Sequence, residues 1–213
     1  MAEVKICGLK QPKEMQLCAK LKVQWVGYVF YPPSPRFISA DHAQILHKSA
    51  PSSHEGGPKR VGLFVKPTFE DVEKILRKVN LDILQLYTST EQAELFRKQF
   101  NIPVWQAKGI ASLADLPTQK TLIDGYVIEA PSSSKDSQPG GLGRTFDWTL
   151  TEKWHSPAPW LLAGGLTPEN VFRAIKISKA QAVDVSSGVE SSKGIKSLEK
   201  IEKFVLNALN GVA

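Results

Sequence analysis

Residues 160–170 of this 213-residue chain read Trp-Leu-Leu-Ala-Gly-Gly-Leu-Thr-Pro-Glu-Asn. The apolar start suits a short buried strand, the two glycines suit a tight turn, and Thr-Pro-Glu suits the N-terminus of a helix. We therefore predict a strand over residues 160–163 and a helix over residues 167–177. A strand that leads directly into a helix is the repeating unit of folds built on parallel sheets.

The same unit recurs along the chain. Predicted strands occupy residues 4–7, 25–30, 60–65, 83–86, 104–107, 126–129, 160–163 and 182–185. Predicted helices occupy residues 11–21, 39–48, 68–79, 90–100, 167–177 and 195–209, and the segments after the fifth and sixth strands are shorter. Eight alternations predict an α/β fold, a (β/α)8 TIM barrel with eight parallel strands and outer helices, in one domain over residues 1–213. The alternative is an open doubly wound sheet, which usually has fewer strands and an early glycine-rich turn.

Glycine-rich turns follow the sixth, seventh and eighth predicted strands, at residues 140–143, 164–167 and 186–188. Glycine lets backbone N–H groups come close to an anion, and a following helix adds the positive end of its dipole. In barrels the loops after the last strands commonly bind phosphate. The three turns therefore predict one phosphate pocket built from several loops.

Reactive side chains lie near the ends of other strands. Cys7 and Glu129 end the first and sixth strands, Asp184 lies within the eighth, and Arg36 lies in the proline-rich loop after the second. Catalytic groups of barrels stand at the carboxyl ends of the strands, so this pattern predicts an enzyme acting on a small sugar phosphate. The plainer interpretations are a buried structural cysteine at position 7 and a surface arginine at position 36.

The composition limits the partners, compartments and metal sites that are expected for this chain. The net charge of +6 comes from scattered basic residues without interleaved aromatics, which argues against nucleic acid as a partner. Two cysteines suit a reducing compartment, and no apolar run reaches the length of a membrane span, so we expect a cytoplasmic protein without membrane contact. The four histidines lack metal-ligand spacing, so no metal site is expected. The sequence fits a monomer or a homodimer.

Five motifs together resemble phosphoribosylanthranilate isomerases, in order and over essentially the whole chain. They are Val-Lys-Ile-Cys-Gly-Leu at 4–9, Gly-Tyr-Val-Phe-Tyr-Pro-Pro-Ser-Pro-Arg at 27–36, Gly-Gly-Leu-Gly-Arg-Thr-Phe-Asp-Trp at 140–148, Ala-Gly-Gly-Leu-Thr-Pro-Glu-Asn-Val at 163–171 and Val-Asp-Val-Ser-Ser-Gly-Val-Glu at 183–190. The resemblance implies a (β/α)8 barrel in tryptophan biosynthesis. The implied reaction converts N-(5-phosphoribosyl)anthranilate into 1-(2-carboxyphenylamino)-1-deoxyribulose 5-phosphate by an Amadori rearrangement, without a cofactor.

The resemblance also implies roles for individual residues. Cys7 matches the general base, so its thiol pKa is expected to be lowered, and Arg36 matches the residue that binds the anthranilate carboxylate. The remaining substrate-binding residues, chiefly for the phosphate, are Gly141, Gly164, Gly165, Asp184, Ser186, Ser187 and Gly188.

The chain departs from the family pattern at two positions. Glu129 stands where the family has an aspartate general acid, and Tyr87 stands where the family usually has the histidine of Gln-Leu-His-Gly. We interpret Glu129 as the general acid. Asp124, which precedes the sixth strand, should lie at the opposite end of the barrel, and Asp136 could reach the site only if the loop of residues 131–141 closes. Two other functions stay open: a phosphate-ligand-binding barrel that lost its acid, and another sugar-phosphate isomerase or lyase.

Overall fold

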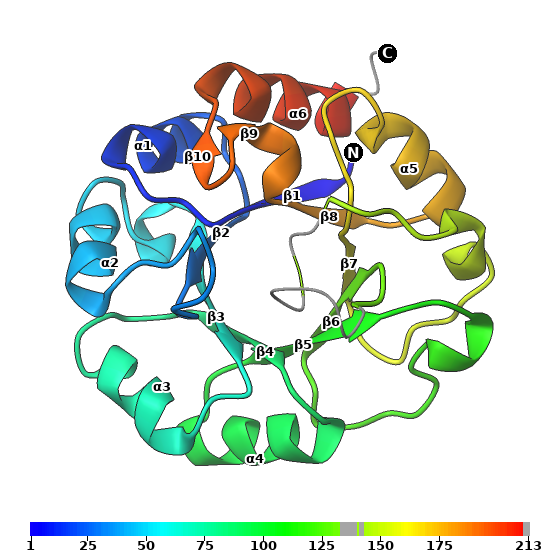
Figure 1. Ribbon diagram of the computed structural model, residues 1–213, viewed down its shortest axis with the longest axis horizontal. Coiled ribbons are helices and arrows are strands. Elements are labelled where there is room, and N and C mark those ends of the chain that lie inside the picture. Colours follow the sequence, from blue (N-terminus) through cyan, green and yellow to red (C-terminus); the bar gives the residue numbers. More distant parts are fainter. Residues whose placement is uncertain (133–139, 141–142, 211–213) are drawn as a thin grey trace.

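The fold is a closed barrel of eight parallel strands in sequence order (Figure 1). It is seen in a computed structural model that describes residues 1–132, 140 and 143–210. The strands are β1 Glu3–Cys7, β2 Trp25–Val29, β3 Lys59–Val65, β4 Ile83–Tyr87, β5 Val104–Gly109, β6 Gly125–Glu129, β7 Trp160–Leu162 and β8 Ala182–Val185. The predicted TIM barrel is confirmed and the alternative, an open doubly wound sheet, is excluded, because β1 pairs with both β2 and β8.

Within the described residues, six α-helices surround the barrel (Figure 1). They are α1 Pro12–Lys20, α2 Ala40–His47, α3 Phe69–Leu76, α4 Thr90–Phe100, α5 Val171–Ser178 and α6 Leu198–Asn210. Short 3-10 helices, η2 Leu113–Asp115 and η3 Trp148–Thr151, lie after β5 and β6, where the sequence predicted shorter segments. Two further 3-10 helices are η1 Ser53–Glu55 and η4 Ser187–Val189.

The predicted start, at Thr167, of the helix after the seventh strand is wrong, because α5 begins at Val171. The Asn170 side chain accepts a hydrogen bond from the Thr167 N–H group at 2.8 Å and donates one to the Gly165 carbonyl at 2.9 Å. Asparagine side chains compete in this way with helical backbone bonds. The competition turns the expected first helical turn into part of the glycine loop.

The predicted start of the last helix at Ile195 is also wrong. Strand β9 Glu190–Ser192 pairs antiparallel with β10 Ile195–Lys196, and α6 begins only at Leu198. Gly194, at φ +81°, adopts the left-handed conformation in the turn between them, which glycine tolerates best. This hairpin returns Lys196 toward the end of β8.

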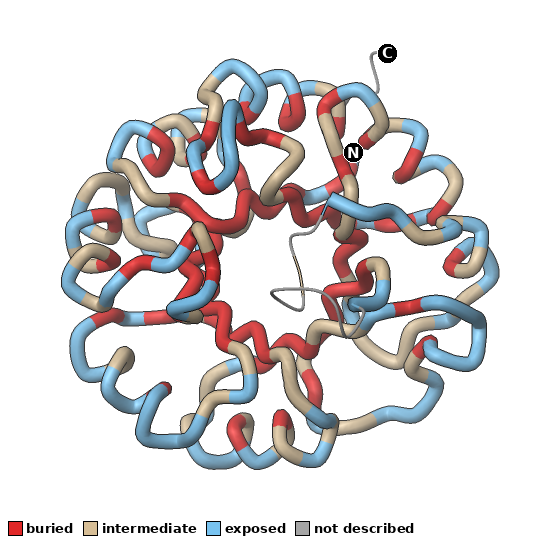
Figure 2. The backbone as a smooth tube through the Cα atoms, in the orientation of Figure 1, coloured by how far each residue is buried: buried red, intermediate tan, exposed pale blue. Residues whose placement is uncertain are grey.

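Apolar residues fill two layers, one inside the barrel and one between the strands and the helices. Figure 2 shows the strands as a buried ring and the outer helices with exposed stretches. Trp25 and Trp105 meet edge to face inside the barrel, with ring centroids 5.3 Å apart, and both lie near the starts of their strands. The amino ends of the strands are thereby plugged, and the carboxyl ends remain for a ligand cavity.

Candidate active site

A cavity opens at the carboxyl ends of the strands. Eight of the ten predicted site residues line it, namely Cys7, Arg36, Glu129, Gly164, Gly165, Asp184, Ser186 and Ser187. Gly188 is not among the lining residues, because it packs against the carbonyl group of Leu166 behind the wall. Gly141 lies outside the described residues. Barrel closure therefore brings together side chains that are far apart in the sequence.

Cys7 is buried at the end of β1, with 4% of its surface exposed, and lines the cavity. Its barrel neighbour is Gly27, where a Cβ atom would lie only 2.7 Å from the Cys7 sulfur. Glycine at this position therefore leaves room for the thiol. Burial raises the pKa of the Cys7 thiol, the Lys5 ammonium opposes that rise, and Asp184 adds to it. The expected lowering of this pKa is wrong, because desolvation outweighs the nearby cation.

Lys5 lies inside the barrel on the same strand, two residues before Cys7, and is 0% exposed. Its Nζ donates to the Asp184 carboxylate at 2.9 Å, and the two residues are register partners between β1 and β8. Burial lowers the pKa of Lys5, but the attraction of Asp184 and Cys7 outweighs burial and the net shift is upward. A permanent ammonium group thus lies beside the thiol, where it favours the thiolate. Lys5 was not predicted as a site residue, although a lysine within an apolar strand indicates a buried ion pair.

We expect Asp184→Asn to lower the free energy of unfolding by about 3–5 kcal/mol, because it leaves the buried Lys5 ammonium without its counter-charge. Urea unfolding at neutral pH measures the change. The matched control is Asp41→Asn, which breaks the ion pair with Lys78 at 2.7 Å, where both side chains are more than half exposed. That control should cost at most about 1 kcal/mol. If both variants lost the same free energy of unfolding, the buried Lys5–Asp184 pair would not be more important for stability than the exposed pair.

Glu129 ends β6 across the cavity and is 6% exposed. Burial raises the pKa of the Glu129 carboxyl to about 8, a hydrogen bond with Tyr87 lowers it, Asp184 raises it, and Lys5 lowers it. The carboxyl is therefore protonated at neutral pH, which is the state that a general acid needs. Asp124 lies before β6, as predicted, and its carboxylate accepts bonds from Arg97 Nε at 2.7 Å and the Val104 N–H group at 2.9 Å. Asp136 lies outside the described residues.

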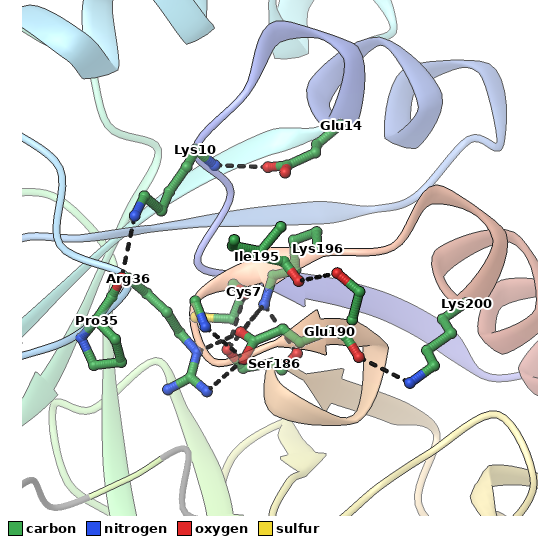
Figure 3. A network of polar contacts seen from close by, with 12 residues as sticks. Cys7, Lys10, Glu14, Pro35, Arg36, Ser186, Glu190, Ile195, Lys196 and Lys200 are labelled. Atoms are coloured by element: carbon green, nitrogen blue, oxygen red, sulfur yellow. Dashed lines mark hydrogen bonds and ion pairs between the residues drawn. The ribbon is translucent and has the colours of Figure 1, made fainter.

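Arg36 is buried and is 4% exposed, which excludes the surface-arginine interpretation. Its Nε and Nη2 donate to the two carboxylate oxygens of Glu190 at 2.6 and 3.0 Å. Lys196 Nζ donates to Glu190 Oε1 at 2.9 Å and to the Ser186 carbonyl at 2.9 Å, so both cations converge on one carboxylate (Figure 3). Burial raises the pKa of Glu190, but bonds from Arg36, Lys196 and the Gly194 N–H group lower it overall to about 2. Glu190 thus stays ionised and fixes the plane of the arginine.

The fixed arginine can still serve a ligand. Its contacts with Glu190 use Nε and Nη2, and the residues that the structure describes place no acceptor on Nη1. Gly8, at φ +79°, leaves room for the aliphatic part of the Arg36 side chain, because a Cβ at position 8 would lie 2.8 Å from Arg36 Cδ. Arg36 lines the cavity with Cys7, so a carboxylate bound there would lie near the thiol. Glu190 and Lys196 were not predicted as the groups that hold Arg36.

The backbone of the turn after β7 packs closely against another segment of the chain. Gly164 and Gly165 have φ values of +82° and +62°, and a Cβ at either position would press on the Arg144–Thr145 segment at 2.9 Å or less. Ser186 and Ser187 line the facing wall after β8, and the Ser186 hydroxyl donates to the Cys7 carbonyl at 3.0 Å. Peptide N–H groups of two glycine-containing turns are donors that suit a phosphate.

Two features are absent from the described part of the chain. No group of three or more His, Cys, Asp or Glu side chains there could hold a metal ion. None of the helices described there is both long enough and apolar enough to cross a membrane.

Comparison with known proteins gives a consistent result. The family model described as N-(5'phosphoribosyl)anthranilate (PRA) isomerase matches residues 4–207. Curated relatives named N-(5'-phosphoribosyl)anthranilate isomerase include those of Acidiphilium cryptum and Rhodospirillum rubrum, both 43% identical, with 98% and 95% of each chain covered.

Solved structures agree with the sequence relatives. The phosphoribosyl anthranilate isomerase of Thermotoga maritima superposes over 100% of both chains, with a TM-score of 0.81 and 30% identity. A structure of a phosphoribosyl anthranilate isomerase in complex with reduced 1-(o-carboxyphenylamino)-1-deoxyribulose 5-phosphate gives a TM-score of 0.79 at 29% identity over 100% of both chains.

Proposed function

The chain belongs to the N-(5'-phosphoribosyl)anthranilate isomerase family, and from this premise we propose that Cys7 is its general base and Glu129 its general acid. The protein is an enzyme of tryptophan biosynthesis. It catalyses the Amadori rearrangement of N-(5-phosphoribosyl)anthranilate to 1-(2-carboxyphenylamino)-1-deoxyribulose 5-phosphate. The observation that carries the two assignments is that the thiol and a neutral carboxyl line the same cavity.

The two groups divide the proton transfers. Glu129 gives its proton to the ribose ring oxygen, the C–O bond of the ring breaks, and a Schiff base forms at C1. The Cys7 thiolate then removes the C2 proton, which gives an enolamine that tautomerises to the ketone. The Lys5 ammonium supports the thiolate during this step, because an adjacent cation stabilises the charged form.

The remaining cavity residues hold the substrate ends. Arg36 binds the anthranilate carboxylate through its free edge, because a guanidinium fixed by Glu190 is already oriented for that contact. The turns at Gly164–Gly165 and Ser186–Ser187 bind the phosphate. This arrangement stretches the substrate across the mouth and places its ribose between Cys7 and Glu129.

The setting of the reaction follows from the same residues. We place it in the cytoplasm, because Cys7 and Cys18 are both free thiols. The proposed catalytic groups and the described binding groups all come from one chain, so a monomer or a homodimer can act.

The proposed pair predicts an alkaline pH optimum. Glu129 has a pKa of about 8, whereas burial raises the thiol pKa above its ordinary value. Below about pH 8 both groups are protonated and no base is available. Between the two pKa values the pair holds one proton, and the molecules that carry it on Glu129 are the active ones. Above the thiol pKa both groups are ionised and no acid is available. The ratio kcat/KM should therefore rise up to about pH 8, level off, and fall at higher pH, with limbs that belong to the pair.

Two measurements check this order of titration. Steady-state kinetics with N-(5-phosphoribosyl)anthranilate gives the two limbs, and the rate of Cys7 alkylation by iodoacetamide, mapped by mass spectrometry, gives the thiol limb alone. Cys18 serves as the internal control, since burial raises its thiol pKa to about 12. A maximum of kcat/KM below about pH 7, or a folded protein that leaves the substrate unchanged, would contradict the assignments.

A further inference from the structure

The two residues that depart from the family pattern, Tyr87 and Glu129, lie close together in the structure. Tyr87 ends β4 and Glu129 ends β6, and only β5 stands between these strands in the barrel. Both side chains line the cavity. A Cβ at Gly140 would collide with the Tyr87 hydroxyl and would lie 3.0 Å from Glu129 Oε1, so the two polar tips share one small region.

Each of the two groups also shifts the pKa of the other: Glu129 raises the pKa of Tyr87, and Tyr87 lowers the pKa of Glu129. Burial, then Glu129 and Cys7, raise the pKa of Tyr87 well above its ordinary value, so the hydroxyl keeps its proton at every pH at which the enzyme works. It can therefore donate to the carboxyl in both protonation states. The other charged or titratable groups that act on Glu129 are Asp184 from β8 and Lys5 from β1.

We propose that Tyr87 is a positioning residue for the general acid: its hydroxyl holds one oxygen of the Glu129 carboxyl and so directs the longer glutamate toward the ribose ring oxygen. This inference rests on the proposed role of Glu129. A glutamate has one more rotatable bond than an aspartate, and its carboxyl is carried one methylene farther from the strand. A misplacement of about 1 Å can cost roughly 100-fold in rate, so a glutamate in this place needs a partner that fixes it.

The variant Tyr87→Phe tests the inference, because it removes one oxygen and keeps the ring. We expect kcat to fall roughly 10- to 100-fold while KM changes by less than about threefold, because the lost contact orients the acid rather than the substrate. The limb of kcat/KM near pH 8 should move to higher pH, since the hydroxyl bond stabilises the ionised carboxylate. The carboxylic C=O band, isolated as the infrared difference between wild type and Glu129→Gln, gives the same titration without turnover.

The matched control is Tyr126→Phe on the same strand as Glu129. Its hydroxyl lies 3.4 Å from the Thr121 hydroxyl, and its ring packs in the layer between barrel and helices. This variant should keep wild-type kcat and both limbs. Thermal unfolding of both variants checks that each is folded at the assay temperature.

The possible outcomes distinguish a failure of the positioning role of Tyr87 from a failure of the general-acid role of Glu129. If Glu129→Gln is active, the acid assignment fails and the role of Tyr87 fails with it. If Glu129→Gln is inactive while Tyr87→Phe keeps wild-type kcat, the acid stands and the positioning role is overturned. A drop in kcat with the kinetic limb and the infrared titration both unmoved would show a merely structural tyrosine and would also overturn it.

Discussion

Replacing Cys7 by serine should lower kcat by roughly 10²- to 10⁴-fold, the usual contribution of a general base. A serine hydroxyl fits the space beside Gly27, but its pKa lies far above that of any thiol, so the Lys5 ammonium cannot populate an alkoxide at neutral pH. The phosphate turns and Arg36 are untouched by this change. Binding of reduced 1-(o-carboxyphenylamino)-1-deoxyribulose 5-phosphate, measured by calorimetry, should therefore change by less than about threefold.

The matched control is Cys18→Ser, which makes the same chemical change in α1. Cys18 is 0% exposed and packs between the barrel and the helices, away from the cavity. A serine there can bond back to a carbonyl one turn earlier in the helix, so the fold should tolerate it. Activity should stay within about twofold of wild type. A Cys7→Ser variant that turns over at the wild-type rate would remove the thiol from the mechanism.

The cavity residues could be predicted because strand order alone brings them together. Cys7 and Glu129 are the last residues of their strands, and Ser186 directly follows its strand. In a closed parallel barrel all such positions share one rim, whatever their separation along the chain. Knowing where each strand ends was therefore enough to place most of the site.

The ion pairs that tune the site could not be predicted in the same way. Lys5 reaches Asp184 across 179 residues, and Arg36 reaches Glu190 across 154. The first contact depends on the register in which β1 closes against β8, and the second on a hairpin that the helical pattern of residues 195–209 concealed. Local sequence patterns carry neither piece of information, so the raised thiol pKa also escaped prediction.

Replacing Glu129 by glutamine should likewise lower kcat by roughly 10²- to 10⁴-fold. Glutamine keeps the length of the side chain and an oxygen that can accept the Tyr87 hydrogen bond, but its amide has no acidic proton to give the ribose ring oxygen. Ring opening then has to rely on water, while the groups that bind the phosphate and the carboxylate remain in place. The expected loss therefore falls on kcat, with KM within about threefold of wild type.

Asp124→Asn is the control that decides whether the position of the carboxyl matters. Asp124 directly precedes β6, at the end of the strand opposite Glu129. Its carboxylate accepts hydrogen bonds from Arg97 and from the Val104 N–H group. Its variant should lose some stability and keep kcat, because no group at that end of the barrel reaches the ribose. Were Glu129→Gln to retain the wild-type rate, the proton would have to come from another acid; Asp136→Asn would then be the variant that loses activity, and the assignment of Glu129 would be rejected.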